Sequence, residues 1–550
     1  MHSNMNRKER FLFFLLLIGS SVAFSQTDVS GVQLKKVRDF SQLIINGKPF
    51  IILGGELGNS IASNMEYLEP FFPKIKSMNL NTVLAPVYWE FLEPEENKFD
   101  FSLVDGMITE ARKNDMKLVL LWFGSWKNSM SCYAPSWMKT NSKRFPRTVD
   151  SNGRSHEIFS VFGKETLEAD KKAFAALMKH IRETDVQQKT VIMVQVENEI
   201  GMLTTAREIS KTANSYFNEN VPPELMTYLQ KNKDMLLPEL KQKWQQYGSK
   251  QNGTWATVFG EGDGADEIFQ AWYYAKYANE VAAAGKKEYN LPMFVNAALP
   301  RPGKRPGEYP SAGPLPHIMD IWQAAATSLD MLSPDFYNPD TKYWCDLYTT
   351  NGNPLFVPEM KLDESCAAKA FFIIGHYKAL GFSPFSIENA DGKVKEALGK
   401  SYDIINQVSE ILFNRKWLSY DGLLVDKKDG AQQLQMGNYM LKVSHEYTMG
   451  WSAGAKDSVW PSSGVMIIQL TEKEFIVAGT GVVITFENKD QNKVTNLLAV
   501  DEIEIKAGKE NFLLRLNGDE DHQGRHVRIA TGNWQIQKVR LYDSPAKVDQ

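Results

Sequence analysis

The sequence predicts an α/β protein, a TIM (β/α)8 barrel with long loop insertions, followed by a C-terminal all-β domain. Apolar, β-branched runs alternate with helix-like segments about eight times over roughly 350 residues. From about residue 417 this alternation stops, and short β-type runs separated by turns take over. Two of the apolar runs end in acidic side chains, Glu199 and Glu359, at the end of the strand where barrel enzymes carry their chemistry.

The expected barrel strands are short apolar runs, and apolar residues recur at helical spacing between them. The strands are expected within residues 50–56, 81–89, 117–124, 190–201, 291–296, 331–337, 355–360 and 381–387. The helices are expected at 67–78, 103–114, 167–184, 266–285, 318–326, 366–380 and 401–414. A doubly wound open sheet has a similar alternation, but residues 54–58 match its glycine-rich phosphate turn poorly.

Three further segments complete the expected order of elements. Residues 32–48 resemble a hairpin with a turn at Asn46-Gly47. The insertions 125–165 and 202–254 are expected over one face of the barrel, the second mostly helical. The short β-type runs of the C-terminal domain predict a sandwich.

The first 25 residues have the pattern of a secretory signal peptide. A charged start with Arg7, Lys8 and Arg10 precedes an apolar run at 11–18 and a small-x-small cleavage pattern at 23–25. An uncleaved anchor is the alternative. The expected domains are therefore a signal peptide (1–25), the catalytic barrel (26–415) and a sandwich-like accessory domain (416–550). The mature chain is expected in the periplasm or outside the cell, with no membrane span.

Composition excludes some partners and leaves others open. The 550-residue chain has a net charge of -4 and no basic patch with interleaved aromatics, so no nucleic-acid partner is expected. Its 13 Trp and 20 Tyr suit either sugar stacking or a large aromatic core. Cys132, Cys345 and Cys366 match no zinc spacing; free buried thiols are expected, although one pair could be oxidised. His156 and His317 lie in long loops without ligand spacing, so no metal or other cofactor is expected.

The two strand-end acids predict a carbohydrate-cleaving site. A retaining glycosidase needs two carboxyl groups about 5–5.5 Å apart, and strands four and seven lie across the barrel mouth. We expect Glu199 to be the acid/base, with a raised pKa, and Glu359 to be the ionised nucleophile. The alternative for Glu199 is an exposed loop acid.

The neighbours of these acids have expected roles as well. Asn198 would hydrogen-bond the sugar 2-hydroxyl, which requires the strand end to bend, so a bulge is expected there. Glu197 would then point elsewhere, as a member of a buried ion pair, with direct catalysis as the alternative. Tyr337, at the end of strand six, is placed to hydrogen-bond the nucleophile or to pack at the edge of the core.

Other strand-end residues could line a sugar pocket. We expect one or more of Trp89, Trp122 and Trp126 to form a stacking platform, with core packing as the alternative for each. Glu56 and Glu90 could bind sugar hydroxyls or pair with Lys or Arg.

The stretch 194–201, Val-Gln-Val-Glu-Asn-Glu-Ile-Gly, resembles the acid/base signature of glycoside hydrolase family 35, the β-galactosidase family. Residues 79–83, Trp89, the pair Glu93-Pro94 and residues 99–101 resemble the segment of that family after strand two. The resemblance implies that Glu199 is the proton donor and Glu359 the nucleophile. The family usually has Pro-Trp-Asn where this chain has residues 88–90, and His where it has Leu92, which leaves the sugar specificity open.

Residues 120–128 and the all-β region look like a bacterial branch with its own C-terminal domain. The resemblance implies an exo-acting, retaining β-galactosidase that acts on oligosaccharides or galactosylated plant glycans. One alternative keeps the mechanism with another sugar, as a β-glucosidase, β-fucosidase or α-L-arabinopyranosidase. The other is a non-catalytic carbohydrate-binding barrel, which has no need for both acids. Oligomeric state cannot be inferred from these residues.

Overall fold

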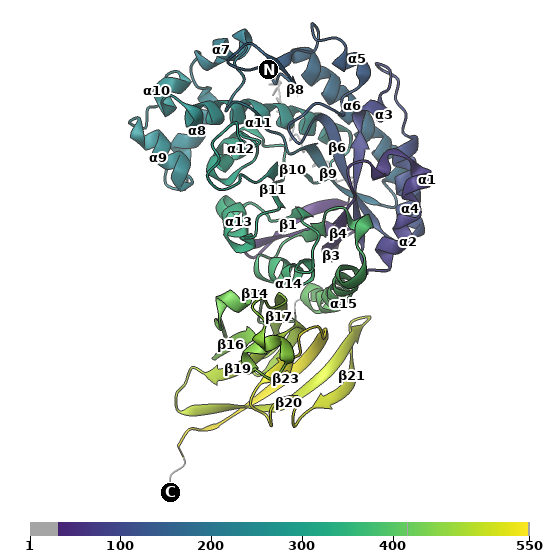
Figure 1. Cartoon of the computed structure of the whole chain (residues 1–550), viewed down its shortest axis with the longest axis vertical. Helices are drawn as coiled ribbons and strands as arrows, with labels where there is room; N and C mark the ends of the chain where they lie inside the picture. The colour runs from purple at the N-terminus through teal and green to yellow at the C-terminus, as the bar shows by residue number, and fades with distance from the viewer. Residues whose placement is uncertain (1–30, 415, 548–550) are drawn as a thin grey trace, which may run out of the picture.

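The structure, a computed structural model, describes residues 31–414 and 416–547, and the expected signal peptide lies outside this range. Eight parallel strands close into a barrel, which confirms the predicted TIM fold (Figure 1). In chain order the strands are β4 (Ile52–Glu56), β5 (Thr82–Tyr88), β6 (Lys117–Lys127), β9 (Val191–Asn198), β10 (Met293–Ala298), β11 (Met331–Phe336), β12 (Val357–Met360) and β13 (Gly381–Pro384).

The apolar runs form these strands because the strands are covered on both faces. Every residue of β5 and β9 is buried, as expected for strands enclosed between the barrel interior and a ring of helices. One main helix leads from each barrel strand to the next. In chain order these helices are α2 (Phe71–Lys76), α4 (Ser102–Lys113), α6 (Lys164–Asp185), α11 (Asp263–Glu288), α12 (Met319–Ala325), α13 (Thr341–Tyr348) and α14 (Cys366–His376). The helix α15 (Gly392–Asn414) follows the last strand and closes the ring. The sequence did not predict α13.

The insertions carry short elements. The excursion after β6 contains α5 (Ser136–Lys139), β7 (Arg147–Val149) and β8 (Ser155–Phe159), and α1 (Met65–Leu68) and α3 (Trp89–Leu92) follow β4 and β5. The insertion after β9 contains α7 (Lys211–Phe217), α8 (Pro223–Lys231), α9 (Pro238–Gln246) and α10 (Trp255–Phe259). It is mostly helical, as predicted. Its helices α8 and α10 pack on α12 and α11, so the insertion widens the barrel on the side away from the C-terminal sheets (Figure 1).

The N-terminal hairpin predicted at 32–48 is present within a three-stranded sheet of β1 (Val32–Val37), β2 (Phe40–Ile45) and β3 (Lys48–Phe50). The turn between β2 and β3 is Asn46-Gly47, and both residues have positive φ, 50° and 78°.

The C-terminal region forms two antiparallel sheets. One has the order β14-β17-β18-β23-β20-β21 and the other β15-β16-β19-β22. Their bounds are β14 (Ser419–Val425), β15 (Gln432–Met436), β16 (Tyr439–His445), β17 (Ser463–Gln469), β18 (Glu474–Thr480), β19 (Val482–Asn488), β20 (Lys493–Lys506), β21 (Lys509–Leu516), β22 (Val527–Ile529) and β23 (Gln535–Pro545). Side chains from both sheets share one apolar core, as in a sandwich.

The larger sheet is covered on both faces. Its other face packs on α14 and α15, which lie between the barrel and the sheets (Figure 1), and Met466, Ile468 and Ile476 belong to the same apolar core as the barrel. The approach is close at Gly422, where a Cβ would lie 2.4 Å from the carbonyl oxygen of Phe371. The C-terminal sheets are therefore firmly packed against the barrel.

Two smaller expectations have outcomes. No helix in the described part of the chain is long and apolar enough to cross a membrane. All three cysteines are free; Cys345 and Cys366 are buried, but Cys132 is exposed, because it lies on the loop that follows β6.

Candidate active site

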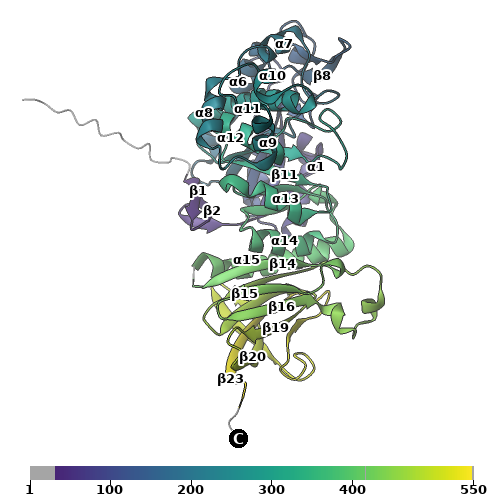
Figure 2. The same cartoon turned by 90° about the vertical axis from the view of Figure 1, so that its left-hand side faces the viewer.

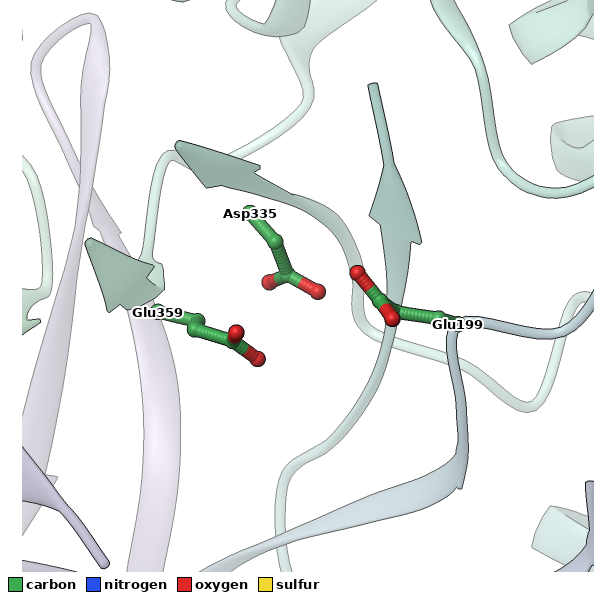
Figure 3. A group of neighbouring side chains, drawn as sticks. All are labelled: Glu199, Asp335 and Glu359. Carbon is green, nitrogen blue, oxygen red and sulfur yellow. The ribbon is translucent and has the colours of Figure 1, made fainter. Parts of the chain in front are cut away.

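Three carboxyl groups converge at the C-terminal end of the barrel. They belong to Glu199, Asp335 and Glu359, and one oxygen from each lies within 4.8 Å of the others (Figure 3). Glu199 follows β9, and the other two lie near the ends of β11 and β12. All three are at least 96% buried. The sequence placed Glu199 and Glu359 together but did not predict Asp335.

The end of β9 bends, as the sequence required. Glu197 and Glu199 have φ values of 60° and 44°, in the left-handed region that side-chain-bearing residues seldom adopt. The pairing of β6 with β9 also shifts: Trp122 pairs with Val196, whereas Lys127 pairs with Asn198. The strand end is therefore bent as expected, but the extra residues of the irregular pairing lie on β6 and not on β9.

Asn296 on β10 connects two of the acids. Its side-chain Oδ1 accepts a 2.9 Å hydrogen bond from the backbone N–H of Glu199. Its Nδ2 donates a 2.6 Å bond to Oδ2 of Asp335. On the other side of Glu199, the exposed Asn128 donates from Nδ2 to Oε2. Glu199 is thus held through its backbone by Asn296 on β10 and through its carboxyl by Asn128, which follows β6.

Tyr337, the residue after β11, donates the hydrogen bond from its hydroxyl to Oε1 of Glu359 that the sequence led us to expect. The other oxygen, Oε2, is buried with no protein partner among the described residues. Burial, followed by repulsion from Glu199, raises the pKa of Glu359 to about 7, whereas Tyr337 and Lys127 act to lower it. Glu359 therefore ionises fully only above neutral pH, higher than the sequence led us to expect.

The site holds a fourth acid and a buried cation. Glu56, at the end of β4, is 1% exposed, and Lys127, at the end of β6, is 4% exposed. Burial raises the pKa of Glu56, with the charge of Glu359 as the next cause. Burial raises the pKa of Glu199 and of Asp335 as well, and the Lys127 ammonium opposes the shift in all these acids. A raised pKa for Glu199 agrees with the expectation for an acid/base.

Asn198 is fully buried, and both its side-chain Nδ2 and Oδ1 have no hydrogen-bond partner in the described part of the chain. An amide in this state costs about 1–3 kcal/mol unless a ligand or water completes it. Its expected contact with a sugar hydroxyl stays a prediction.

The expectation for the three tryptophans is wrong. Trp89, Trp122 and Trp126 are all 0% exposed, so none presents a ring face to a sugar. The rings of Trp89 and Trp122 lie 5.9 Å apart. That of Trp126 packs edge-on against Tyr277, 4.6 Å away. The strand ends are covered by the long loops and by α11, which converts these residues into core.

Glu197 does point away from the other acids, but its partner is not a cation. Its carboxyl accepts a 2.8 Å bond from the N–H of Trp126 and shares a hydrogen bond with the carboxyl of Asp170 on α6. Asp170 also accepts from Trp122 Nε1 at 2.9 Å and from Ser125 Oγ at 2.6 Å. Burial raises the pKa of both acids; the charge of Asp170 raises that of Glu197 further, whereas the hydrogen bond from Glu197 acts to lower that of Asp170. The partner of Glu197 is thus a second buried carboxyl where an ion pair was expected, and we expect the two acids to share one proton.

Other candidates lie outside the group. Glu90 is on α3, where it pairs with Lys139 at 3.5 Å, the alternative named for it from the sequence. His156 pairs with Asp150, and His317 with Glu267.

Glu199, Asp335 and Glu359 have the spacing of a metal site. Oxygen ligands alone suit a hard cation such as Ca²⁺ or Mg²⁺. The buried Lys127 ammonium faces the same carboxyls and would compete with such an ion.

A closed (β/α)8 barrel with paired carboxyls at the ends of its fourth and seventh strands has the architecture of two-carboxylate barrel glycosidases. Residues 42–271 match the family model of glycosyl hydrolases family 35, which confirms the resemblance seen in the sequence. Residues 398–528 match a domain of unknown function (DUF5597).

Relatives are similar over limited parts of their length. The human beta-galactosidase-1-like protein 3 is 29% identical over 164 residues, which are 28% of this chain and 23% of that protein. The β-galactosidase of Rahnella sp. R3 has a TM-score of 0.46 at 15% identity, over 66% of this chain and 57% of its own. For that of Bacillus circulans sp. alkalophilus the TM-score is 0.45 at 13% identity, over 65% and 56%. The chain thus spans about a quarter of the human relative.

Proposed function

We propose that the protein is a retaining, exo-acting β-galactosidase that releases terminal β-D-galactosyl groups from oligosaccharides or plant polysaccharide side chains. The observation that carries this proposal is the separation of Glu199 and Glu359, whose nearest oxygens lie within 4.8 Å. Retaining enzymes place their carboxyls about 5–5.5 Å apart, whereas inverting enzymes need about 6.5–9.5 Å to admit water. The family match and the human relative support galactose as the sugar.

Glycoside cleavage then follows in two steps. The Glu359 carboxylate attacks the anomeric carbon while the bond to the leaving oxygen breaks, and Glu199 gives its proton to that oxygen. A glycosyl ester of Glu359 results. Glu199, now ionised, takes a proton from water, whose oxygen bonds to the anomeric carbon as the ester breaks. Two inversions return the β configuration.

The charge state of the site suits this exchange. The mechanism starts with one proton on the pair, on Glu199, and the pKa of both groups is raised. Lys127 and the Tyr337 hydroxyl favour the ionised form of Glu359. Two interacting acids titrate as a unit, so the activity is expected to follow a bell-shaped pH profile.

The proposed setting follows from the sequence. We propose export to the periplasm or beyond the cell after removal of residues 1–25, with 26–415 as the catalytic domain and 416–550 as the accessory domain. The departure from the family at Glu90 lies on α3, paired with Lys139 and outside the carboxyl group.

A panel of aryl β-glycosides tests the proposal with wild type, Glu199→Ala and Glu359→Ala. We expect cleavage of the β-galactoside, an inactive Glu359→Ala, and a Glu199→Ala enzyme that azide restores. Cleavage of only the glucoside, fucoside or α-L-arabinopyranoside would retain the mechanism and replace the sugar. If the protein binds sugars but cleaves no glycoside, the proposal is wrong and the protein is a non-catalytic carbohydrate-binding barrel.

A further inference from the structure

A cleft of about 870 Å³ lies beside the contact between the barrel and the C-terminal sheets, and both parts line it. One wall is formed by residues 363–365, which follow β12, and by the first turns of α15. The opposite wall is formed by the segment before β17 and the turn between β22 and β23. Sites for small ligands typically enclose roughly 300–1,000 Å³, so the cleft is large enough for a ligand.

The C-terminal wall has aromatic rings beside polar groups that lack partners. Trp460 and Trp534 both line the cleft. Three polar atoms of residues that line this wall, Trp460 Nε1, Ser463 Oγ and Thr480 Oγ1, lie beneath its surface and have no hydrogen-bond partner among the residues that the structure describes. Each such group costs about 1–3 kcal/mol when left unsatisfied. Donors and acceptors beside an aromatic ring are the groups that a sugar ring engages, through its hydroxyls and its apolar face.

The rings on this wall are held in place. Trp534 stacks on Phe371 of α14 at 5.9 Å, and Trp460 packs on His445 at 4.8 Å. The ammonium of Lys427 lies 4.8 Å from the centre of the Trp460 ring, but this side chain is exposed and can be displaced by a ligand.

The charges around the cleft favour an uncharged ligand. Asp363, Glu364, Glu396 and Asp457 line it together with Lys393 and Lys400, so both signs are interspersed with an excess of acids. Such a wall disfavours an anion and admits a neutral ligand.

The cleft opens beside the carboxyl site. Asp363 comes four residues after Glu359, so their Cα atoms lie at most roughly 14 Å apart. Figure 2 shows the light-green segment between β16 and β17, which carries Trp460, projecting to the same side of the molecule as α1 and β8, both on the catalytic face of the barrel. A chain of a few sugars leaving the site could therefore reach the cleft.

We propose that this cleft is a second carbohydrate site, which binds the neutral glycan chain whose terminal sugar lies between Glu199 and Glu359. The inference rests on the proposed function, because that function supplies the sugar chain. It gives the C-terminal sheets a role, namely to select long or branched substrates over small galactosides.

The test compares substrates of increasing length on the full chain. We expect kcat/KM of the wild type to rise with the length of β-(1→4)-linked galactooligosaccharides. Trp460→Ala should reduce this rise in kcat/KM about tenfold, the effect expected for the loss of one aromatic contact. It should leave the hydrolysis of 4-nitrophenyl β-galactoside unchanged. Trp451→Ala is the matched control, because Trp451 is half-exposed in the same domain and does not line the cleft. Equal length profiles for wild type and Trp460→Ala would overturn the proposal.

A second variant tests the proposal if Trp460→Ala does not fold. Ala397→Arg, on α15, fills the cleft with a long side chain without removing a core residue, and should reduce the length gain in the same way. If no galactoside is cleaved, the proposed function fails separately. The cleft is then tested by calorimetry, which measures the binding of the oligosaccharides to Glu359→Gln with and without Ala397→Arg. About tenfold weaker binding to the protein with Ala397→Arg supports the proposal. Equal binding to both proteins, or no binding to either, overturns it.

Discussion

The hydroxyl of Tyr337 donates a hydrogen bond to Oε1 of Glu359, across the ends of two neighbouring barrel strands. This bond acts to lower the pKa of Glu359, against burial and the charge of Glu199. The tyrosine therefore helps to hold the proposed nucleophile in its ionised form.

Tyr337→Phe should reduce kcat/KM about tenfold to a hundredfold, the range for a hydrogen bond to a charged group. Loss of the donor raises the pKa of Glu359 above about 7, so the acidic limb of the pH profile should move to higher pH. The pH dependence of kcat/KM measures both effects. An unchanged acidic limb would show that Tyr337 does not help to ionise the nucleophile.

Asn128→Ala should move the alkaline limb to higher pH. Asn128 donates to Oε2 of Glu199 and thereby lowers its pKa, so its loss lets the proposed acid keep its proton longer as pH rises. The exposed position of Asn128 makes a folding defect unexpected. A shift of the alkaline limb to lower pH would contradict the assignment of Glu199 as the acid.

Lys127→Met should raise the pKa of the four buried acids together, because the ammonium of Lys127 opposes protonation of each. We expect kcat/KM at pH 7 to fall about fivefold, because a rise of about one unit from a pKa of about 7 lowers the ionised fraction of Glu359 from about a half to about a tenth, and to recover partly at higher pH. Lys113→Met, at an exposed position on α4, is the control. Equal losses at all pH values would indicate a packing role for Lys127.

The Asp170–Glu197 pair should make stability fall as pH rises. Both carboxyls have a raised pKa in the folded state, so the folded protein holds more protons than the unfolded chain above about pH 4. The melting temperature of wild type should therefore fall more steeply between pH 5 and 9 than that of Asp170→Asn. Asp115→Asn, at a fully exposed side chain, is the control and should follow wild type. Parallel curves for wild type and Asp170→Asn would rule out the shared proton.

Gly422→Val should destabilise the docking of the C-terminal sheets. A Cβ at this position would lie 2.4 Å from the Phe371 carbonyl oxygen, and overpacking of this kind typically costs about 1–3 kcal/mol. Gly264→Ala, where the nearest atom is 3.6 Å away on a lysine side chain, is the control. Thermal unfolding that is unchanged by Gly422→Val would contradict the packing of α14 on β14.

Much of the fold could be predicted from the sequence because barrel strands are buried on both faces and appear as continuous apolar runs. All eight were located, and two of them ended in the acids that meet at the barrel mouth. The longest C-terminal strand, β20, was missed because its apolar run at 497–500 is short and charged or polar residues interrupt the apolar ones on both sides of it. The helix α13 was missed because no helical spacing was assigned between strands six and seven.

The site was less predictable, because burial and contacts decide which strand-end residues face it. Asp335 and Lys127 gave no signal apart from their positions at the ends of apolar runs, and Asn296 appeared only as the end of a strand. Trp89, Trp122 and Trp126 carried a signal for sugar stacking, but the loops bury them. Charged residues at the strand ends would have predicted the site better than the tryptophans did.

The configuration of the first product tests the central claim most directly. Hydrolysis of 4-nitrophenyl β-galactoside can be followed by proton NMR, before the released sugar equilibrates between its anomers. The separation of Glu199 and Glu359 predicts that β-galactose appears first and the α anomer only later. Initial release of α-galactose would contradict the assignment of Glu359 as a nucleophile and would require an inverting mechanism.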